Sequence, residues 1–141
     1  MRLIMIRYDP EEGAQRFVID NELEKVVREK AAHVIKEEWN PESGEFSVMM
    51  DYFEYEYPLP LKKEQYELFK NFNMRKEGKV VVVRVPYFVI MFPKYPYEGA
   101  PVVVYLITPF FEDRVDELME FAKQVSSGIN EMPEESEGQL E

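Results

Sequence analysis

Two runs in the second half of the chain are apolar at nearly every position. The first is VVVVRVPYFVIMFP, from Val80 to Pro93, and the second is VVVYLIT, from Val102 to Thr108. Alternate residues of a strand face opposite sides of a sheet, so runs that are apolar in both parities predict strands covered on both faces. Such strands need helices, or a partner, on each side. Because Pro86 has no backbone N–H, we expect a bulge or a break there.

Shorter patterns predict the other strands. RLIMIRY (residues 2–8) and QRFVID (15–20) read as a hairpin whose turn contains Pro10 and Gly13. EFSVMMDYFEYEY (45–57) reads as one long strand. In its first half the even-numbered residues are apolar, and beyond Tyr52 the odd-numbered ones are, so the apolar face of this strand is expected to change side.

The first predicted helix begins after Asn21 and ends at NPESG, residues 40–44. Asn21 is the expected N-cap, and Glu24, three residues later, completes a pattern like a capping box. One face of this helix is apolar at helical spacing. Its members are Leu23, Val26, Val27, Ala31, Val34 and Ile35.

The second predicted helix is KKEQYELFKNF (62–72), followed by a turn at RKEGK (75–79). Its inward-facing residues are expected to be Tyr66, Phe69 and Phe72. The third helix is expected to begin with Thr108 as cap and Pro109 as first residue, and to stop at Gly128. The element order predicts an α/β (α+β) domain with a mixed sheet of four to five strands and about three helices.

Charge and composition narrow the possible functions. The chain has 141 residues and a net charge of −11, and we expect one globular domain over 1–129 with an acidic, disordered tail over 130–141. An acidic surface disfavours general nucleic-acid binding. The chain contains 23 Glu and only 5 Asp, which is typical of thermostable proteins. Without an apolar run of about 20 residues or a secretory signal, we expect a cytoplasmic protein that does not enter membranes.

The sequence lacks the motifs that several kinds of chemistry require. The absence of cysteine excludes disulfides, thiol catalysis and cysteine zinc sites. The six glycines are scattered singly, so no phosphate-binding loop is formed and no cofactor is predicted. The single histidine, His33, lies at the rim of the apolar face of the first helix. It is a weak candidate for a general base, because no nucleophile motif accompanies it.

The stretch DYFEYEY, from Asp51 to Tyr57, places three carboxylates and four aromatic rings in seven residues. Glu54 and Glu56 point to one side of a strand, roughly 7 Å apart, and Asp51 points to the other. These carboxylates are weak candidates for a divalent-metal site and for catalysis, because hard cations bind carboxylate oxygens. The favoured interpretation is an edge strand whose outward charges prevent further strand pairing.

The chain has more tyrosine than a core of this size usually satisfies, with nine in all. Tyrosine is enriched at protein interfaces because its ring is apolar and its hydroxyl polar. The candidate binding surface consists of Tyr52, Phe53, Tyr55, Tyr57, Tyr95 and Tyr97. The leading hypothesis is therefore a non-catalytic domain that acts through protein contacts, as a homodimer or with another protein. A metal-dependent hydrolase built on the acidic strand is the alternative.

The loop FPKYPYEGAP (92–101) resembles the loop of ubiquitin-conjugating enzymes and RWD domains that joins two strands through Pro, Tyr-Pro and a second Pro. The matching residues are Phe92, Pro93, Tyr95, Pro96 and Pro101. The resemblance covers about ten residues and implies a binding module of that shape. Conjugating activity is excluded, since the chain has no catalytic cysteine.

Overall fold

Six strands and three α-helices form the structure, a computed structural model that describes residues 1–128. Their bounds are β1 Arg2–Asp9, β2 Gly13–Asp20, α1 Leu23–Glu38, β3 Ser47–Pro58, α2 Lys63–Phe69, β4 Asn73–Glu77, β5 Val80–Pro93, β6 Val102–Pro109 and α3 Val115–Ser126, with a 3-10 turn at Glu112–Arg114 before α3. The predicted α+β class is confirmed.

The strands form one sheet in the order β2-β1-β6-β5-β3, with β4 also paired to β5. Every pairing whose register is described is antiparallel. The prediction of a mixed sheet with four to five strands was therefore wrong in strand direction and in strand number. The described residues form two compact units, one of residues 1–49 with 88–128, and one of residues 50–87.

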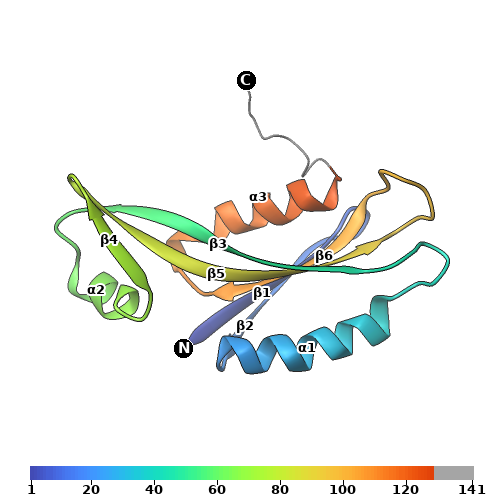
Figure 1. The fold of residues 1–141 in the computed structure, drawn as a ribbon, viewed down its shortest axis with the longest axis horizontal. Helices are drawn as coiled ribbons and strands as arrows, with labels where there is room; N and C mark the ends of the chain where they lie inside the picture. The colour runs from blue at the N-terminus through green and yellow to red at the C-terminus, as the bar shows by residue number, and fades with distance from the viewer. Residues whose placement is uncertain (129–141) are drawn as a thin grey trace, which may run out of the picture. The chain divides into compact units, whose positions relative to one another are not determined.

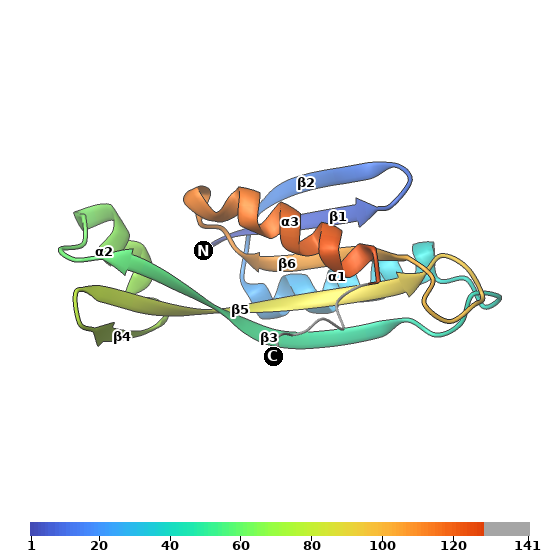
Figure 2. The same cartoon turned by 90° about the horizontal axis from the view of Figure 1, so that it is seen from above.

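In the first unit, helices cover both faces of strands β1 and β6. Figure 1 shows α1 and α3 on opposite sides of these strands, and Figure 2 shows α3 lying along them. Leu3 and Met5 of β1 belong to the core cluster that includes Val26 and Val34 of α1. The alternate residue Ile4 is also fully buried and points to the other face, where α3 lies. The apolar run of β6 is buried at every position from Val103 to Pro109, which confirms the prediction of a strand covered on both faces.

In the second unit, β4 and β5 form a hairpin that turns at Gly78, whose positive φ of 63° favours glycine. The ring of Phe69 at the end of α2 is buried against Tyr57, with centroids 4.5 Å apart. Phe69 therefore faces inward as predicted, but Tyr66 is exposed and Phe72 only half-buried. The helix is shorter than predicted, because the chain turns after Phe69 to begin β4.

Strand β4 was missed, and part of it was assigned to a turn. Only Met74 among its five residues is even half-buried, so no alternation of apolar residues marks it as a strand. It forms because its backbone pairs with β5, from Asn73 opposite Arg84 to Glu77 opposite Val80. Pairing with a strongly β-forming neighbour thus decides the conformation of a polar segment.

The expected break at Pro86 is absent, because β5 runs continuously from Val80 to Pro93. Residues 80–84 of β5 pair with β4, and residues 88–93 pair with β6. Pro86 lies between the two registers, where the partner strand changes. A proline is tolerated there because neither of these ladders requires its missing N–H.

Two helix starts also differ from expectation. The Oδ1 of Asn21 accepts a hydrogen bond from the adjacent N–H of Glu22, and Glu22 itself precedes the helix without a side-chain cap. Thr108 is fully buried in β6, opposite Ile4 of β1, so it cannot cap a helix. α3 begins only at Val115 and ends as predicted before Gly128. The predicted tail, 130–141, lies outside the residues that the structure describes.

The buried face of α3 gives a test of the fold. Leu118 is 1% exposed, so Leu118→Ala should lower the free energy of unfolding by about 2–5 kcal/mol through lost burial and a residual cavity. Chemical denaturation measures this change. Glu120→Ala on the exposed face of the same helix is the control, expected within about 0.5 kcal/mol of the parent. Equal effects of the two substitutions would contradict the assigned helix face.

Candidate functional site

A groove of about 620 Å³ lies in the first unit between the β1–β2 hairpin and α1. Its apolar lining residues are Met5, Phe17, Ile19 and Val34, and its polar and charged ones are Arg7, Glu12, Gln15, Lys30, His33, Glu37, Glu38 and Tyr105. The groove exists because α1 packs above β1 and β6 and leaves most of β2 uncovered, although Ile19 still packs at the edge of the core cluster. Met5 is buried, whereas Phe17, directly opposite it on β2, is 48% exposed.

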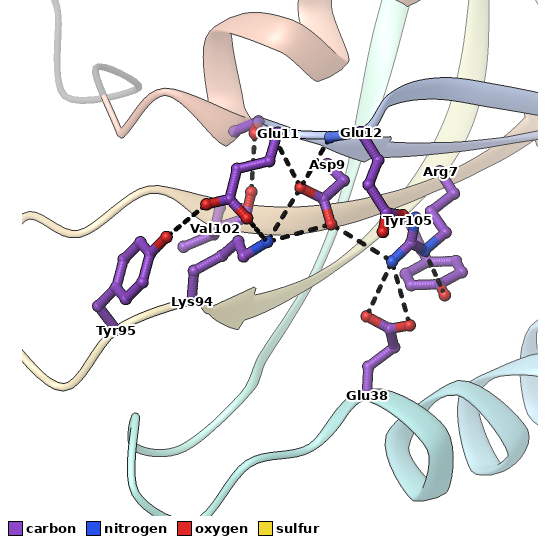
Figure 3. Close-up of polar contacts among 10 residues, drawn as sticks. Arg7, Asp9, Glu11, Glu12, Glu38, Lys94, Tyr95, Val102 and Tyr105 are labelled. Carbon is purple, nitrogen blue, oxygen red and sulfur yellow. Dashed lines mark hydrogen bonds and ion pairs between the residues drawn. The ribbon is translucent and has the colours of Figure 1, made fainter.

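A network of ion pairs lies beside one end of this groove, at the end of β1 (Figure 3). Asp9 is almost fully buried, and its Oδ1 accepts hydrogen bonds from the backbone N–H groups of Glu11 and Glu12. The Nζ of Lys94 donates to both carboxylate oxygens of Asp9, at 3.1 and 3.3 Å, and to Oε1 of Glu11 at 2.7 Å. The hydroxyl of Tyr95 donates to the other oxygen of Glu11, at 2.6 Å. The loop after β5 is thereby tied to the β1–β2 turn.

Arg7 forms the second half of the network. Its Nη2 donates to both carboxylate oxygens of Glu38, near the end of α1, at 3.2 Å each. Its Nε donates to the hydroxyl of Tyr105 at 2.9 Å, and Nη2 lies 3.5 Å from Asp9. Figure 3 shows the guanidinium of Arg7 between these groups. The side chain is largely buried, so these contacts compensate for the loss of its hydration.

The ionisation of this cluster follows from its contacts. Burial alone would raise the pKa of Asp9, but the backbone N–H of Glu11 and the ammonium of Lys94 outweigh it and hold that pKa below its usual value. Hydrogen bonds from Lys94 and then Tyr95 lower the pKa of Glu11. The hydrogen bond to Glu11 raises the pKa of Lys94. All three groups therefore stay charged near neutral pH, which suits a structural link and not a proton-transferring pair.

This network was not predicted from the sequence. The Asp9–Pro10 turn was recognised, and an Asp before a turn commonly accepts a hydrogen bond from a backbone N–H two residues on. That local signal could have predicted the bond from Glu11. Nothing local indicated Lys94, which is 85 residues away along the chain.

The predicted catalytic candidates lie in different surroundings. His33 is exposed on α1 and lines the groove together with Lys30 and Glu37. Asp51, Glu54 and Glu56 are exposed on β3. The carboxylate of Glu54 accepts two hydrogen bonds from the guanidinium of Arg75, at 3.1 and 3.2 Å, so a cation already holds it. Within residues 1–128, no three His, Asp or Glu side chains are grouped so that they could hold a metal ion.

The predicted aromatic surface is divided between exposed and buried rings. Tyr55 and Tyr57 are each 5% exposed, and Phe53 stacks on Tyr87 with centroids 4.2 Å apart. Burial, with the nearby charge of Asp51, raises the pKa of Tyr87 to about 12. Tyr52 is exposed and lies beneath the guanidinium of Arg84, 4.1 Å from its ring centroid.

Tyr95 and Tyr97, the remaining members of the predicted surface, lie in the loop between β5 and β6. Both are exposed, and their rings stack at 5.9 Å with an interplanar angle of 9°. Tyr95 is also anchored by its bond to Glu11, so this part of the loop presents a preformed aromatic pair to solvent.

Residues 2–127 match the model of a protein family described as "Uncharacterized protein conserved in archaea (DUF2286)". The chain belongs to this family. The DUF2286 match covers every described helix and strand, so the fold above is that of the family's characteristic region. No curated protein and no solved structure matches the chain. None of the helices within residues 1–128 has the length and apolar character needed to cross a membrane.

The Asp9 network predicts a pH-dependent stability. At pH 7, Asp9→Asn should lower the free energy of unfolding by about 1–3 kcal/mol, because the ion pair with Lys94 is lost. The pKa of Asp9 is lower in the folded than in the unfolded chain, so this contribution is present above pH ~4. It is lost as the pH falls through the lowered folded-state pKa. Thermal melts from pH 7 to 2 would measure it.

The control for this experiment is Glu29→Gln, which changes an exposed glutamate of α1. Its melting temperature should follow that of the parent at every pH. A stability difference for Asp9→Asn that stays constant down to the lowest pH would contradict the charged state assigned to Asp9.

Proposed function

We propose that this protein acts through protein–protein contacts and associates with itself as a homodimer. The observation that carries the proposal is the exposure of apolar side chains on both edge strands of the sheet. On β2, Phe17 is 48% and Val18 47% exposed. On β3, Val48 and Met50 are each 52% exposed.

The first half of β3 has an apolar face that is covered at only one end. Val48 and Met50 share a parity with Phe46, which packs on Phe92 with ring centroids 5.9 Å apart. Unlike Phe46, Val48 and Met50 are exposed within the described chain. An apolar face that one copy leaves exposed is typical of a surface that a partner covers.

β2 and the first four residues of β3 also lack most of the features that protect the edges of monomeric sheets. Natural edge strands are commonly short, charged, interrupted by proline or bulged. β2 is eight residues long and contains no proline, and its only charged residues are Arg16 and Asp20. The segment of β3 from Ser47 to Met50 has no charge at all. Unprotected edges of this kind favour pairing with another chain.

The exposed aromatic residues support the same proposal. Tyr52, Tyr95 and Tyr97 remain accessible and offer rings that lose little conformational freedom when a partner binds. Tyr55 and Tyr57 are buried and contribute to the core instead of to the predicted contact surface. In the groove and its adjoining network, Arg7, Asp9 and Lys94 are engaged with one another or with neighbouring groups, which favours binding over catalysis.

Light scattering coupled to size-exclusion chromatography tests the proposal. At micromolar concentrations in about 0.15 M salt, where the repulsion between acidic chains is screened, we expect about twice the chain mass of 16.8 kDa. Dilution should shift the mass toward the single chain. A constant mass of one chain up to millimolar concentration would refute the homodimer.

A further inference from the structure

The homodimer proposed above needs an interface, and the sequence of β2 is complementary to itself. We propose that a second copy of this chain pairs antiparallel along the outer edge of β2, with Val18 opposite Val18 of the second copy. This inference rests on the proposed self-association and names the surface that produces it.

The backbone of β2 offers the hydrogen-bonding groups for this pairing. The N–H of Asn21 donates to the carbonyl of Met1 at 3.1 Å, and the register continues with Asp20 opposite Arg2 and Ile19 opposite Leu3. In an antiparallel pair, residues alternate between bonding to the neighbouring strand and facing away from it. The N–H and C=O groups facing away from β1 are therefore those of Ala14, Arg16, Val18 and Asp20. Within residues 1–128, β2 is the end of the sheet, and no strand pairs with this edge.

Charge selects the register. When Val18 faces Val18, each Arg16 faces an Asp20 of the other copy, so two opposite-charge pairs flank the symmetry axis. Opposite charges directly across a sheet stabilise the pair, and like charges destabilise it. A register centred on Phe17 would place Arg16 opposite Val18, and one centred on Arg16 would bring two guanidinium groups together. The Val18 register also pairs the outward-facing residues with one another, as a hydrogen-bonded ladder requires.

The other face of β2 gains apolar contacts in the same register. Phe17 of each copy comes opposite Ile19 of the other, which gathers four apolar side chains on the side of the sheet that carries the groove. Phe17 is exposed in one copy alone, and Ile19 packs at the edge of the core cluster. The pairing would extend that core across the two-fold axis.

The β3 edge is less suited to pairing with itself. Its twelve residues contain three carboxylates, Asp51, Glu54 and Glu56, and no basic side chain. Two antiparallel copies of β3 would collect six like charges along one seam. The mixed charges of β2 create no such repulsion, so they favour a second copy of this chain as the occupant of the β2 edge.

Cysteine cross-linking tests the axis, since the chain has no native cysteine. Val18→Cys would place the two introduced cysteines opposite each other, with Cα atoms about 5.5 Å apart, within the range that a disulfide spans. Mild oxidation should yield a covalent dimer on a non-reducing gel. Ala14→Cys is the matched control on the same strand and face. In this register its two copies are separated by eight residues along the seam, roughly 26 Å, and should cross-link at least tenfold more slowly.

Exchange of charges tests the register. Arg16→Asp or Asp20→Arg alone would place like charges opposite each other at both ends of the seam, and each should raise the dimer dissociation constant about tenfold. The double variant Arg16→Asp/Asp20→Arg restores opposite pairs and should return the constant to within about threefold of the parent. Because Asp20 also lies opposite Arg2 within the hairpin, thermal melts of each variant check that the fold is retained.

The outcomes separate this inference from the proposal on which it rests. Preferential cross-linking at Val18→Cys, together with rescue by the double charge exchange, supports the β2 interface. The β2 interface is overturned if the dimer dissociation constant is unchanged by the charge exchanges and Val18→Cys cross-links no faster than Ala14→Cys. The homodimer itself is retained in that case. Cross-linking through Met50→Cys instead would place the interface on β3 and also overturn it. A parent chain that stays monomeric overturns both.

Discussion

The structure depends on covering both faces of β6. Residues from Val103 to Pro109 are buried in succession, so this strand cannot lie on a sheet with one wet face. β1 is also buried on both faces, with Leu3 and Met5 on one side and Ile4 on the other. One helix on each face, α1 and α3, supplies the cover. Two helices are too few to cover a whole sheet, so the edge strands β2 and β3 keep exposed apolar side chains.

Ion pairs and hydrogen bonds fix the segments around this core, namely the β1–β2 turn, the loop after β5 and the end of α1. Asp9, Lys94 and Glu11 join the β1–β2 turn to the loop after β5, and Arg7 joins β1 to the end of α1 through Glu38. Each charged group meets an opposite charge or a hydrogen-bond donor. Bonded in this way, the carboxylates and the ammonium stay charged, so the cluster stabilises the hairpin that presents β2.

Edge strands link the fold to its proposed role. α1 on one face and α3 on the other leave much of β2 without cover, so Phe17 is exposed beside the groove and Val18 is exposed on the opposite face. The backbone groups of such an edge can pair with any extended chain that has compatible side chains. The arrangement of Arg16, Val18 and Asp20 narrows the partner to a strand with the reversed charge order, and an antiparallel second copy of β2 has that order.

The sequence by itself determined the segments whose own residues carry a periodic signal. The apolar runs of β5 and β6 and the apolar face of α1 were readable because burial requires apolar residues at regular spacing.

Only the tertiary structure decided what depends on a neighbour. β4 is a strand because β5 pairs with it, and Thr108 belongs to β6 because β1 lies beside it. Tyr55 is buried and Val48 exposed although both are apolar strand residues, because cover comes from elements distant in the chain. Asp9 meets Lys94 for the same reason, since only the folded sheet brings residues 85 positions apart into contact.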